Sequence, residues 1–273
     1  ADVEIENRPF VTLKSTEGVA HIKVNCLEKE FNIKCKPKFG YCVKEKRFIP
    51  IKILDVPGLI KDAHKGVGLG LSFLDQLIEA DLLIHILDIS GSTNDKGEPV
   101  ESGSYNPEKD IEILENEIDQ WFLSLLRKKW DLIARHVEQE HQNLKDEIAK
   151  QFSGLKITEE NIKEAIKKLN LNKEHPLKWS EADLISFIKE LRRSSKPIII
   201  AANKIDILGS EKNLENLRKK FINHLIIPCS AEIELTLREA SKDNLIEYIP
   251  GENDFKILQE EKLNTKQKNA LNF

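Results

Sequence analysis

The chain has 273 residues, and its 42 Lys and Arg nearly balance 46 Asp and Glu, which leaves a formal net charge of -4. No overall basic field would attract nucleic acid, so any such contact needs a local patch. Apolar residues make up 40% of the chain and charged residues 32%, and no apolar run reaches the ~18 residues of a membrane span, so we do not expect a secreted or membrane-inserted protein.

The ends of the sequence and its cysteines indicate in which cellular compartment the protein is found. The chain begins at Ala1, contains no methionine and stops at Phe273 within an apparent helix, so we expect both ends to be cut. The start has neither a basic leader nor an apolar stretch, and the four cysteines form no CxxC pair. We therefore expect a cytoplasmic, monomeric protein that does not contact a membrane.

Residues 1–91 are expected to form the first part of an α/β domain. Residues 19–25 alternate between apolar and polar side chains as a strand does, and residues 48–56 form a longer strand that contains Asp55. The Cys-, Lys- and Gly-rich stretch between them indicates an extended hairpin. The run LLIHIL at residues 82–87 is typical of a short strand buried on both faces.

Residues 92–193 are predicted to be a helical insertion. A polar stretch rich in Gly and Ser opens it, and apolar residues then recur at helical spacing. Ser180 followed by Asp183 is typical of a capped helix start. A small aromatic core is expected here, because the insertion holds all three tryptophans: Trp121, Trp130 and Trp179.

Residues 194–250 return to the α/β pattern. Residues 198–202 and 225–228 are short apolar runs typical of buried strands, and a helical pattern follows each of them. Strands that alternate with helices on both sides of an insertion predict a mostly parallel sheet interrupted by a helical domain. Residues 251–273 are expected to begin a linker.

Three of the cysteines lie close together in the sequence. Cys26, Cys35 and Cys42 flank the expected hairpin, whereas Cys229 stands alone. One interpretation is that they are small hydrophobic residues around the hairpin. The other is a zinc site completed by a fourth ligand from elsewhere, and the sequence leaves both open.

Residues with recognisable chemistry follow two of the predicted strands. Asp55 begins the sequence DVPG, in which a carboxylate can hold Mg²⁺ through water and Gly58 lets a backbone N–H approach a terminal phosphate. In NKID, the carboxylate of Asp206 can accept hydrogen bonds from N1–H and the exocyclic amine of guanine, a donor pair that adenine lacks. Asn203 can bridge neighbouring loops, and the stem of Lys204 can cover a base face.

A third strand end carries the sequence CSA. The small residues Cys229 and Ser230 leave room for a base, and the backbone N–H of Ala231 can reach a guanine oxygen. Ligands of open α/β sheets bind at the carboxyl ends of strands. The order of the three loops therefore favours a guanine-nucleotide site.

DVPG, NKID and CSA in this order resemble the translation-factor-type GTPases. Residues 7–12 (NRPFVT) resemble the first switch of Obg-like GTPases, and residues 59–70 (LIKDAHKGVGLG) resemble their glycine-rich second switch. Residues 231–240 and 246–251 are similar to an archaeal and fungal branch that is related to YchF. That branch has a helical insertion in the same place and ends in a TGS domain, so the resemblance implies a Ras-like P-loop GTPase fold.

The resemblance also implies a role for each matching residue. Thr12 would coordinate Mg²⁺ in the GTP state, Asp55 would lie in its outer shell, and Gly58 would contact the γ-phosphate. YchF has Glu where this chain has Asp206 and prefers ATP, so the NKxD form favours GTP over an ATPase alternative. The guanine base would be bound by Asn203, Lys204 and Asp206, supported by Ser230 and Ala231.

Two departures from the family pattern affect catalysis. The phosphate-binding sequence GxxxxGK[ST] does not occur in the 273 residues, and we expect it just before Ala1. The position after DVPG is Leu59, which cannot orient a water molecule, and His64 is the nearest polar candidate. An exposed His64 without a catalytic role, and groups supplied by a partner, are the alternatives.

The sequence thus predicts part of a Mg²⁺-dependent GTPase of the Obg-like family that binds GTP and GDP. We expect the chain alone to bind nucleotide poorly, because it lacks the phosphate loop, and the TGS domain would follow Phe273. Clusters such as Arg127-Lys128-Lys129 are compatible with a ribosome or RNA partner. The alternative is a degenerate, non-hydrolysing GTPase that acts as a ribosome- or protein-binding module.

Overall fold

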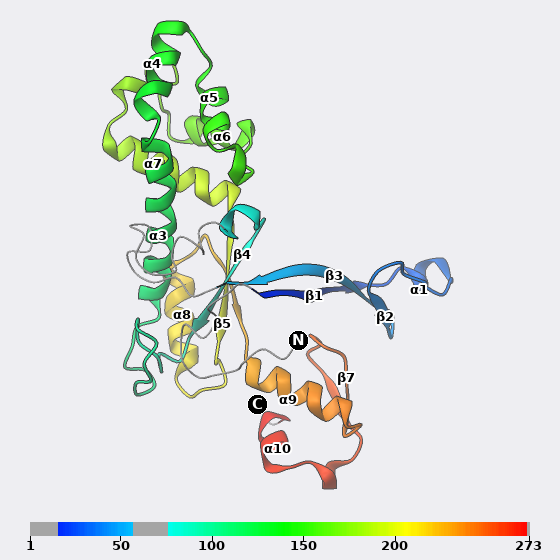
Figure 1. The fold of residues 1–273 in the computed structure, drawn as a ribbon. Helices are drawn as coiled ribbons and strands as arrows, with labels where there is room; N and C mark the ends of the chain where they lie inside the picture. Colours follow the sequence, from blue (N-terminus) through cyan, green and yellow to red (C-terminus); the bar gives the residue numbers. More distant parts are fainter. Residues whose placement is uncertain (1–15, 57–75, 272–273) are drawn as a thin grey trace.

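The computed structural model describes residues 16–56 and 76–271. A parallel three-stranded sheet lies at its centre, and an antiparallel three-stranded sheet projects from it (Figure 1). Most of the helices lie beside the parallel sheet or beyond its two ends. The strands are β1 (Thr16–Asn25), β2 (Tyr41–Val43), β3 (Lys46–Asp55), β4 (Leu83–Asp88), β5 (Ile198–Asn203), β6 (Leu225–Pro228), β7 (Ile246–Tyr248) and β8 (Phe255–Ile257). The helices are α1 (Glu28–Phe31), α3 (Glu108–Arg127), α4 (Trp130–Glu140), α5 (Leu144–Gln151), α6 (Glu159–Lys168), α7 (Glu181–Ser195), α8 (Ser210–Lys220), α9 (Ala231–Lys242) and α10 (Thr265–Leu271).

Strands β4, β5 and β6 form a parallel sheet in that order, which confirms the α/β fold class. Each strand is a short run of β-branched and other apolar residues, which suits a sheet with a covered face. On that face, Leu87, Ile200 and Ile226 pack against the start of α3 and against α8. All three strands run in one direction, so their carboxyl ends lie at one edge.

The opposite face of the parallel sheet differs from the prediction that residues 82–87 form a strand buried on both faces. Ile84 is 53% exposed and Ile86 is 70% exposed, and Leu225 on β6 is 59% exposed. Side chains of a strand alternate between the two faces, so these residues point away from α3 and α8. In the part of the chain that is described, only one face of this sheet is well covered.

Strands β1, β3 and β2 form the second sheet, which is antiparallel. The β1–β3 pair runs in register from Thr16 opposite Asp55 to Asn25 opposite Lys46, and it projects from the rest of the fold as a long ribbon (Figure 1). Helix α1 lies at the far end of this ribbon. Most side chains of the ribbon are exposed or half-buried. The hairpin expected between residues 25 and 48 is therefore present but has little core.

Helices α3 to α7 lie between β4 and β5 and pack around an aromatic core, as the sequence predicts. The ring centroids of Trp130 and Trp179 are 5.2 Å apart, and those of Trp179 and Phe187 are 5.4 Å apart. The guanidinium of Arg192 ties α7 to α3, because its Nε donates to Asp119 Oδ1 at 2.9 Å. The buried members of this core include Trp121, Phe122, Trp130, Phe152, Trp179 and Phe187.

Helix α3 belongs to two cores. Ile111 near its start packs with the parallel sheet, whereas Phe122 and Leu126 near its end pack among the other helices. The domain limits expected at residues 92 and 193 therefore stay a prediction, since one helix connects both packing units. None of the helices in the described ranges is both long enough and apolar enough to cross a bilayer.

The chain ends in a small unit built from α9, the β7–β8 hairpin and α10. Ala240, Ile246 and Leu263 form its buried core. Tyr248 on β7 donates a hydrogen bond from its hydroxyl to Glu234 Oε2 on α9 at 2.6 Å. This contact fixes the hairpin against the helix that follows the third predicted nucleotide loop.

Candidate nucleotide site

The carboxyl edge of the parallel sheet gathers the predicted guanine loops. Asp88 at the end of β4 lies opposite Asn203 at the end of β5, and Ala202 lies opposite Pro228 at the end of β6. The loop after β6 is held to β5, because the N–H of Cys229 donates to the carbonyl of Ala202 at 2.9 Å. Parallel pairing therefore brings together two loops that are 25 residues apart in sequence, counted from Lys204 to Cys229.

Asn203 connects these loops. Its Oδ1 accepts a hydrogen bond from the backbone N–H of Ala231 at 2.9 Å, and its own carbonyl accepts one from the N–H of Ile89 at 3.0 Å. A carboxamide oxygen bound by a backbone N–H fixes the relative position of two loops without a covalent link. The bridge between loops that the sequence suggested for Asn203 is present, and the N–H of Ala231 is already used in it.

Lys204 has an unusual backbone and a fixed side chain. Its φ of 66° lies in the left-handed region, which costs a non-glycine residue roughly 1 kcal/mol or more. Its Nζ donates to Asp88 Oδ2 at 2.8 Å and to Ser92 Oγ at 3.2 Å. These contacts hold the Lys204 side chain across the edge of the sheet.

Asp88 is a member of the site that the sequence analysis missed. Its carboxylate accepts hydrogen bonds from Ser92 Oγ and Thr93 Oγ1 at 2.8 Å each, besides Ser90 and Lys204. Burial tends to raise the pKa of Asp88, but the hydrogen bonds from Lys204 and the hydroxyls outweigh it and lower the pKa. The signal was available, because Asp88 follows an apolar strand as Asp55 does.

Asp206 differs from Asp88 in its partners. Its Oδ1 is buried and has no hydrogen-bond partner among the described residues, whereas the backbone around it is fixed by the bond from the Ile207 N–H to the Lys204 carbonyl at 3.1 Å. A buried acceptor without a donor costs about 1–3 kcal/mol. Such an atom at the carboxyl edge of a parallel sheet is suited to receive donors from a ligand.

Ser230 begins helix α9. Its Oγ accepts a hydrogen bond from the N–H of Ile233 at 3.2 Å, so it acts as an N-cap. Beside this residue opens a cavity of about 750 Å³, between α9 and the β1 strand. Cys229, Ser230 and Ile205 line it from the sheet side. A volume of several hundred Å³ is typical of small-molecule sites, although Asp206 is outside this lining.

The predicted phosphate and metal residues are only partly described. Thr12, Gly58 and His64 lie outside the described residues. Asp55 is exposed at the end of β3, opposite Thr16, in the antiparallel sheet. The structure thus brings together Asn203, Lys204, Asp206, Ser230 and Ala231, and it places Asp55 on a different sheet.

Comparison with known proteins supports the same interpretation. The family described as "50S ribosome-binding GTPase" matches residues 1–129, and the family "Obg-like GTPase YGR210-like, G4 motif-containing domain" matches residues 201–273. A GTP-binding protein of Methanocaldococcus jannaschii is 44% identical over 99% of this chain and 67% of its own length. The chain belongs to the Obg-like family of GTP-binding proteins.

Other members of the Obg-like family are more distant. A GTP-binding protein of Schizosaccharomyces pombe is 33% identical over 92% of this chain and 61% of its own length. The ribosome-binding ATPase YchF of Mycoplasma genitalium is 29% identical over 83% of this chain and 57% of its own length. The chain thus spans about two thirds or less of the length of these relatives.

A solved structure has the same fold. The GTP-binding protein from Pyrococcus horikoshii OT3 superimposes with a TM-score of 0.72 at 36% sequence identity, over 86% of this chain and 63% of the other. A TM-score at this level together with this identity supports a shared P-loop GTPase architecture. The Ras-like fold that the resemblance implied is therefore confirmed at the level of fold class.

Proposed function

We propose that this chain is the guanine-binding part of an Obg-like GTPase, and that Asp206 recognises the base. The supporting observation is the buried Oδ1 of Asp206, which has no partner within the described protein. Guanine offers two neighbouring donors, N1–H and the exocyclic amine, to a carboxylate. Adenine offers no such pair, so a site of this kind discriminates by leaving the carboxylate unpaired when the wrong base binds.

The other loop residues assist Asp206 in this proposal. Asn203 holds the Ala231 backbone in place through its bond at 2.9 Å, and Ser230 caps the helix that begins beside it. The Lys204 stem covers one face of the base while Asp88 holds its ammonium group. A guanine oxygen that contacts the Ala231 N–H would share that donor with Asn203.

Phosphate binding and hydrolysis involve residues of the first part of the chain. We propose that Thr12 and Asp55 hold Mg²⁺, Gly58 approaches the γ-phosphate, and His64 orients the attacking water. Oxygen ligands of this kind suit Mg²⁺, which neutralises charge on the phosphates when bound. These assignments rest on the resemblance of the sequence to the switch segments of the family.

The physiological role follows from the relatives. The Mycoplasma genitalium relative is a ribosome-binding ATPase, and one matching family is described as ribosome-binding. We propose a cytoplasmic, monomeric protein of the archaeal and fungal branch, which carries a TGS domain and acts on the ribosome. The archaeal and fungal sources of two relatives favour that branch.

The missing phosphate loop predicts weak binding by the chain alone. GxxxxGK[ST] does not occur in the 273 residues, and that loop supplies backbone N–H groups and a lysine to the phosphates in P-loop proteins. We expect base recognition to remain but affinity to be low. A version extended ahead of Ala1 by a strand and such a loop should bind guanine nucleotides at least about a hundredfold more tightly, because it adds these contacts to the phosphates. Each tenfold gain in affinity corresponds to about 1.4 kcal/mol of binding free energy.

Competition between GDP and ADP tests this function. We expect the extended version to prefer GDP by at least about a hundredfold in a fluorescent-nucleotide displacement assay. Asp206→Glu should reduce that preference, because a longer side chain displaces the carboxylate from the base. An extended protein that folds but binds neither nucleotide would contradict the proposal and favour a non-hydrolysing binding module.

A further inference from the structure

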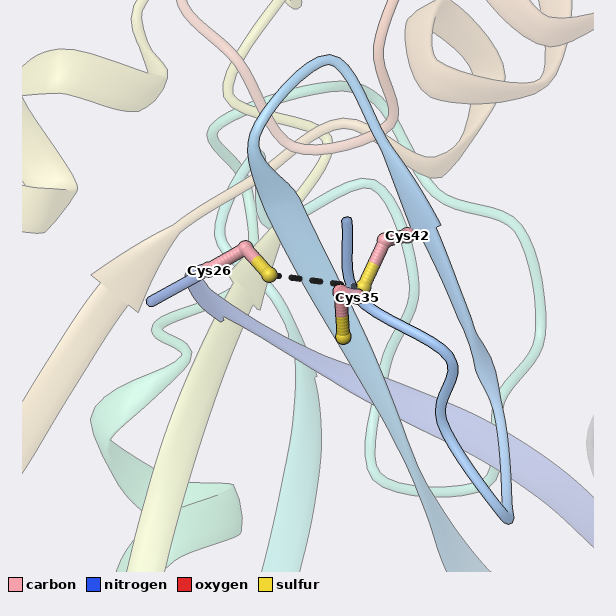
Figure 2. A group of neighbouring side chains, drawn as sticks. All are labelled: Cys26, Cys35 and Cys42. Carbon is pink, nitrogen blue, oxygen red and sulfur yellow. Dashed lines mark hydrogen bonds between the residues drawn. The ribbon is translucent and has the colours of Figure 1, made fainter. Parts of the chain in front are cut away.

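Three cysteines meet at the tip of the β1–β3 ribbon. Cys26 directly follows β1, Cys35 lies in the segment after α1, and Cys42 is on β2. Their sulfur atoms all lie within 4.8 Å of one another, and the Sγ atoms of Cys26 and Cys42 are 3.6 Å apart. Figure 2 shows Cys26 and Cys42 turned toward each other, with the side chain of Cys35 beside them.

Separate backbone features hold each cysteine in place. The N–H of Cys26 donates to the Glu45 carbonyl at 2.7 Å, and Cys42 lies opposite Arg47 in the β2–β3 register. The N–H of Cys35 donates to Glu28 Oε2 at 3.1 Å. The three cysteines lie in one short segment of the chain, and these local contacts bring their sulfur atoms together.

Packing of small hydrophobic residues explains only one of the three. Cys26 is 9% exposed, whereas Cys35 and Cys42 are half-buried and lie on a ribbon with hardly any core. Around them, Phe31, Ile33 and Phe39 are all more than 60% exposed. The thiols therefore do not fill a hydrophobic interior, which removes the simpler interpretation of the sequence for Cys35 and Cys42.

The spacing of the sulfur atoms suits a soft or borderline metal ion. A tetrahedral Zn²⁺ with Zn–S bonds of about 2.3 Å separates its sulfur ligands by about 3.8 Å. The observed 3.6 Å between the Sγ atoms of Cys26 and Cys42 is close to that distance. The Sγ of Cys35, which lies within 4.8 Å of both, would have to move only slightly toward them. A set of three thiols excludes Mg²⁺ and Ca²⁺, which bind oxygen ligands.

The charge beside Cys42 favours its thiolate, whereas a carboxylate oxygen of Glu28 lies next to the backbone of Cys35. The Nη1 of Arg47 lies 4.0 Å from the Sγ of Cys42, and its Nη2 donates to the Phe39 carbonyl at 2.6 Å, which fixes the guanidinium. The segment between Cys35 and Cys42 holds Lys36 and Lys38 and no acidic residue. Three thiolates around Zn²⁺ leave one net negative charge, and Arg47 offsets it as an outer-shell partner.

We propose that Cys26, Cys35 and Cys42 bind one Zn²⁺ ion through three thiolates, with the fourth position open to water or to a ligand from outside the cluster. Each thiol loses its proton on binding, so three protons are released to solvent. The ion closes the segment from residue 26 to residue 42 and orders the exposed tip of the ribbon. This site is separate from the nucleotide loops, so it does not depend on the proposed function.

Replacement of Zn²⁺ by Co²⁺ gives the most specific test. The purified, reduced chain should bind one Co²⁺ and show thiolate-to-cobalt charge-transfer absorption together with the ligand-field bands of tetrahedral cobalt. Zn²⁺ should displace it at a ratio of one ion per chain. Each of Cys26→Ser, Cys35→Ser and Cys42→Ser should weaken Zn²⁺ binding at least tenfold and reduce the charge-transfer band.

Cys229→Ser is the matched control, because Cys229 is a free cysteine outside the ribbon, at the end of β6. It should leave both metal binding and the cobalt spectrum unchanged. Circular dichroism and urea unfolding establish that the serine variants are folded. The proposal is wrong if folded, reduced protein shows no thiolate-to-cobalt band, if the serine variants keep full affinity, or if mass spectrometry finds a Cys26–Cys42 disulfide that forms in place of metal binding.

Discussion

At the scale of single residues, the two charged side chains of the NKID loop differ in how the protein satisfies them. Lys204 is held by Asp88 and Ser92, whereas Asp206 keeps a buried oxygen that has no partner in the described part of the chain. The arrangement gives the loop a fixed cation and an unused acceptor. A site that is prepared before the ligand arrives loses less conformational entropy on binding.

The imidazole of His85 predicts a pH dependence of stability. Burial lowers the pKa of His85 to about 4, although the charge of Glu115 acts to raise it, and within residues 16–56 and 76–271 its Nδ1 has no hydrogen-bond partner. The unfolded chain takes up this proton near the ordinary pKa of about 6.5, so folding stability is lost as the pH falls from about 6.5 toward about 4. His85 alone should lower the free energy of unfolding by about 2 kcal/mol between about pH 7 and pH 5.

Urea unfolding of the unaltered chain and of His85→Phe at both pH values measures this effect. The Phe variant keeps an aromatic ring in β4 and removes the titrating group, so its stability should fall less over the same interval. Equal losses in the two proteins would mean that His85 is not the source of the pH dependence.

The sequence predicted some of these residues and missed others for a physical reason. Asn203 ends β5, and Lys204 and Asp206 follow it, so a one-dimensional pattern was enough to place them at the end of a strand. The partners of Lys204 are Asp88 at the end of β4 and Ser92 in the loop after it, 116 and 112 residues away in the sequence, and the parallel pairing of β4 with β5 brings them close. Such contacts depend on strand order, which the sequence pattern does not specify.

At the scale of elements, helix α7 begins with a reciprocal cap. Ser180 Oγ accepts from the Asp183 N–H at 3.2 Å, and Asp183 Oδ2 accepts from the Ser180 N–H at 2.8 Å. The helix carries Phe187, Leu191 and Arg192 into the helical core, so its start matters to the whole insertion.

Ser180→Ala should destabilise the protein by about 1 kcal/mol, because it removes one of two hydrogen bonds to helix N–H groups. The effect is measured by urea unfolding monitored through tryptophan fluorescence. Ser104→Ala, at an exposed loop position, provides the control and should change the free energy by less than about 0.5 kcal/mol. A Ser180→Ala variant as stable as that control would show that the cap is dispensable.

The elements themselves were largely predictable, and their environment was less so. Helical periodicity and the Ser180 cap predicted α7, and apolar runs predicted β4 and β5. The exposed face of the parallel sheet was not expected, because the run LLIHIL carries apolar residues on both sides of the strand and does not show which side a helix covers. The convergence of three cysteines also depends on the register of the ribbon.

At the scale of the whole molecule, the nucleotide loops and the helical insertion are mechanically connected. Helix α3 begins in the core of the parallel sheet and ends in the core of the insertion, and α7 leads from that core back into β5. Figure 1 shows α3 running alongside the sheet and up into the group of helices. The parallel sheet and the insertion are therefore linked by packing through α3 and by the chain through α7.

The central claim is that Asp206 reads guanine, and Asp206→Asn tests it most directly. Xanthine has a carbonyl where guanine has its amine, so the amide of Asn can donate to xanthine where the carboxylate accepted from guanine. In the version extended by a phosphate loop, we expect this variant to lose affinity for GDP at least tenfold and to gain affinity for xanthosine diphosphate. Asp131→Asn, an exposed position on α4, should change neither. If Asp206→Asn kept its preference for GDP, Asp206 would not contact the base and the proposed site would be wrong.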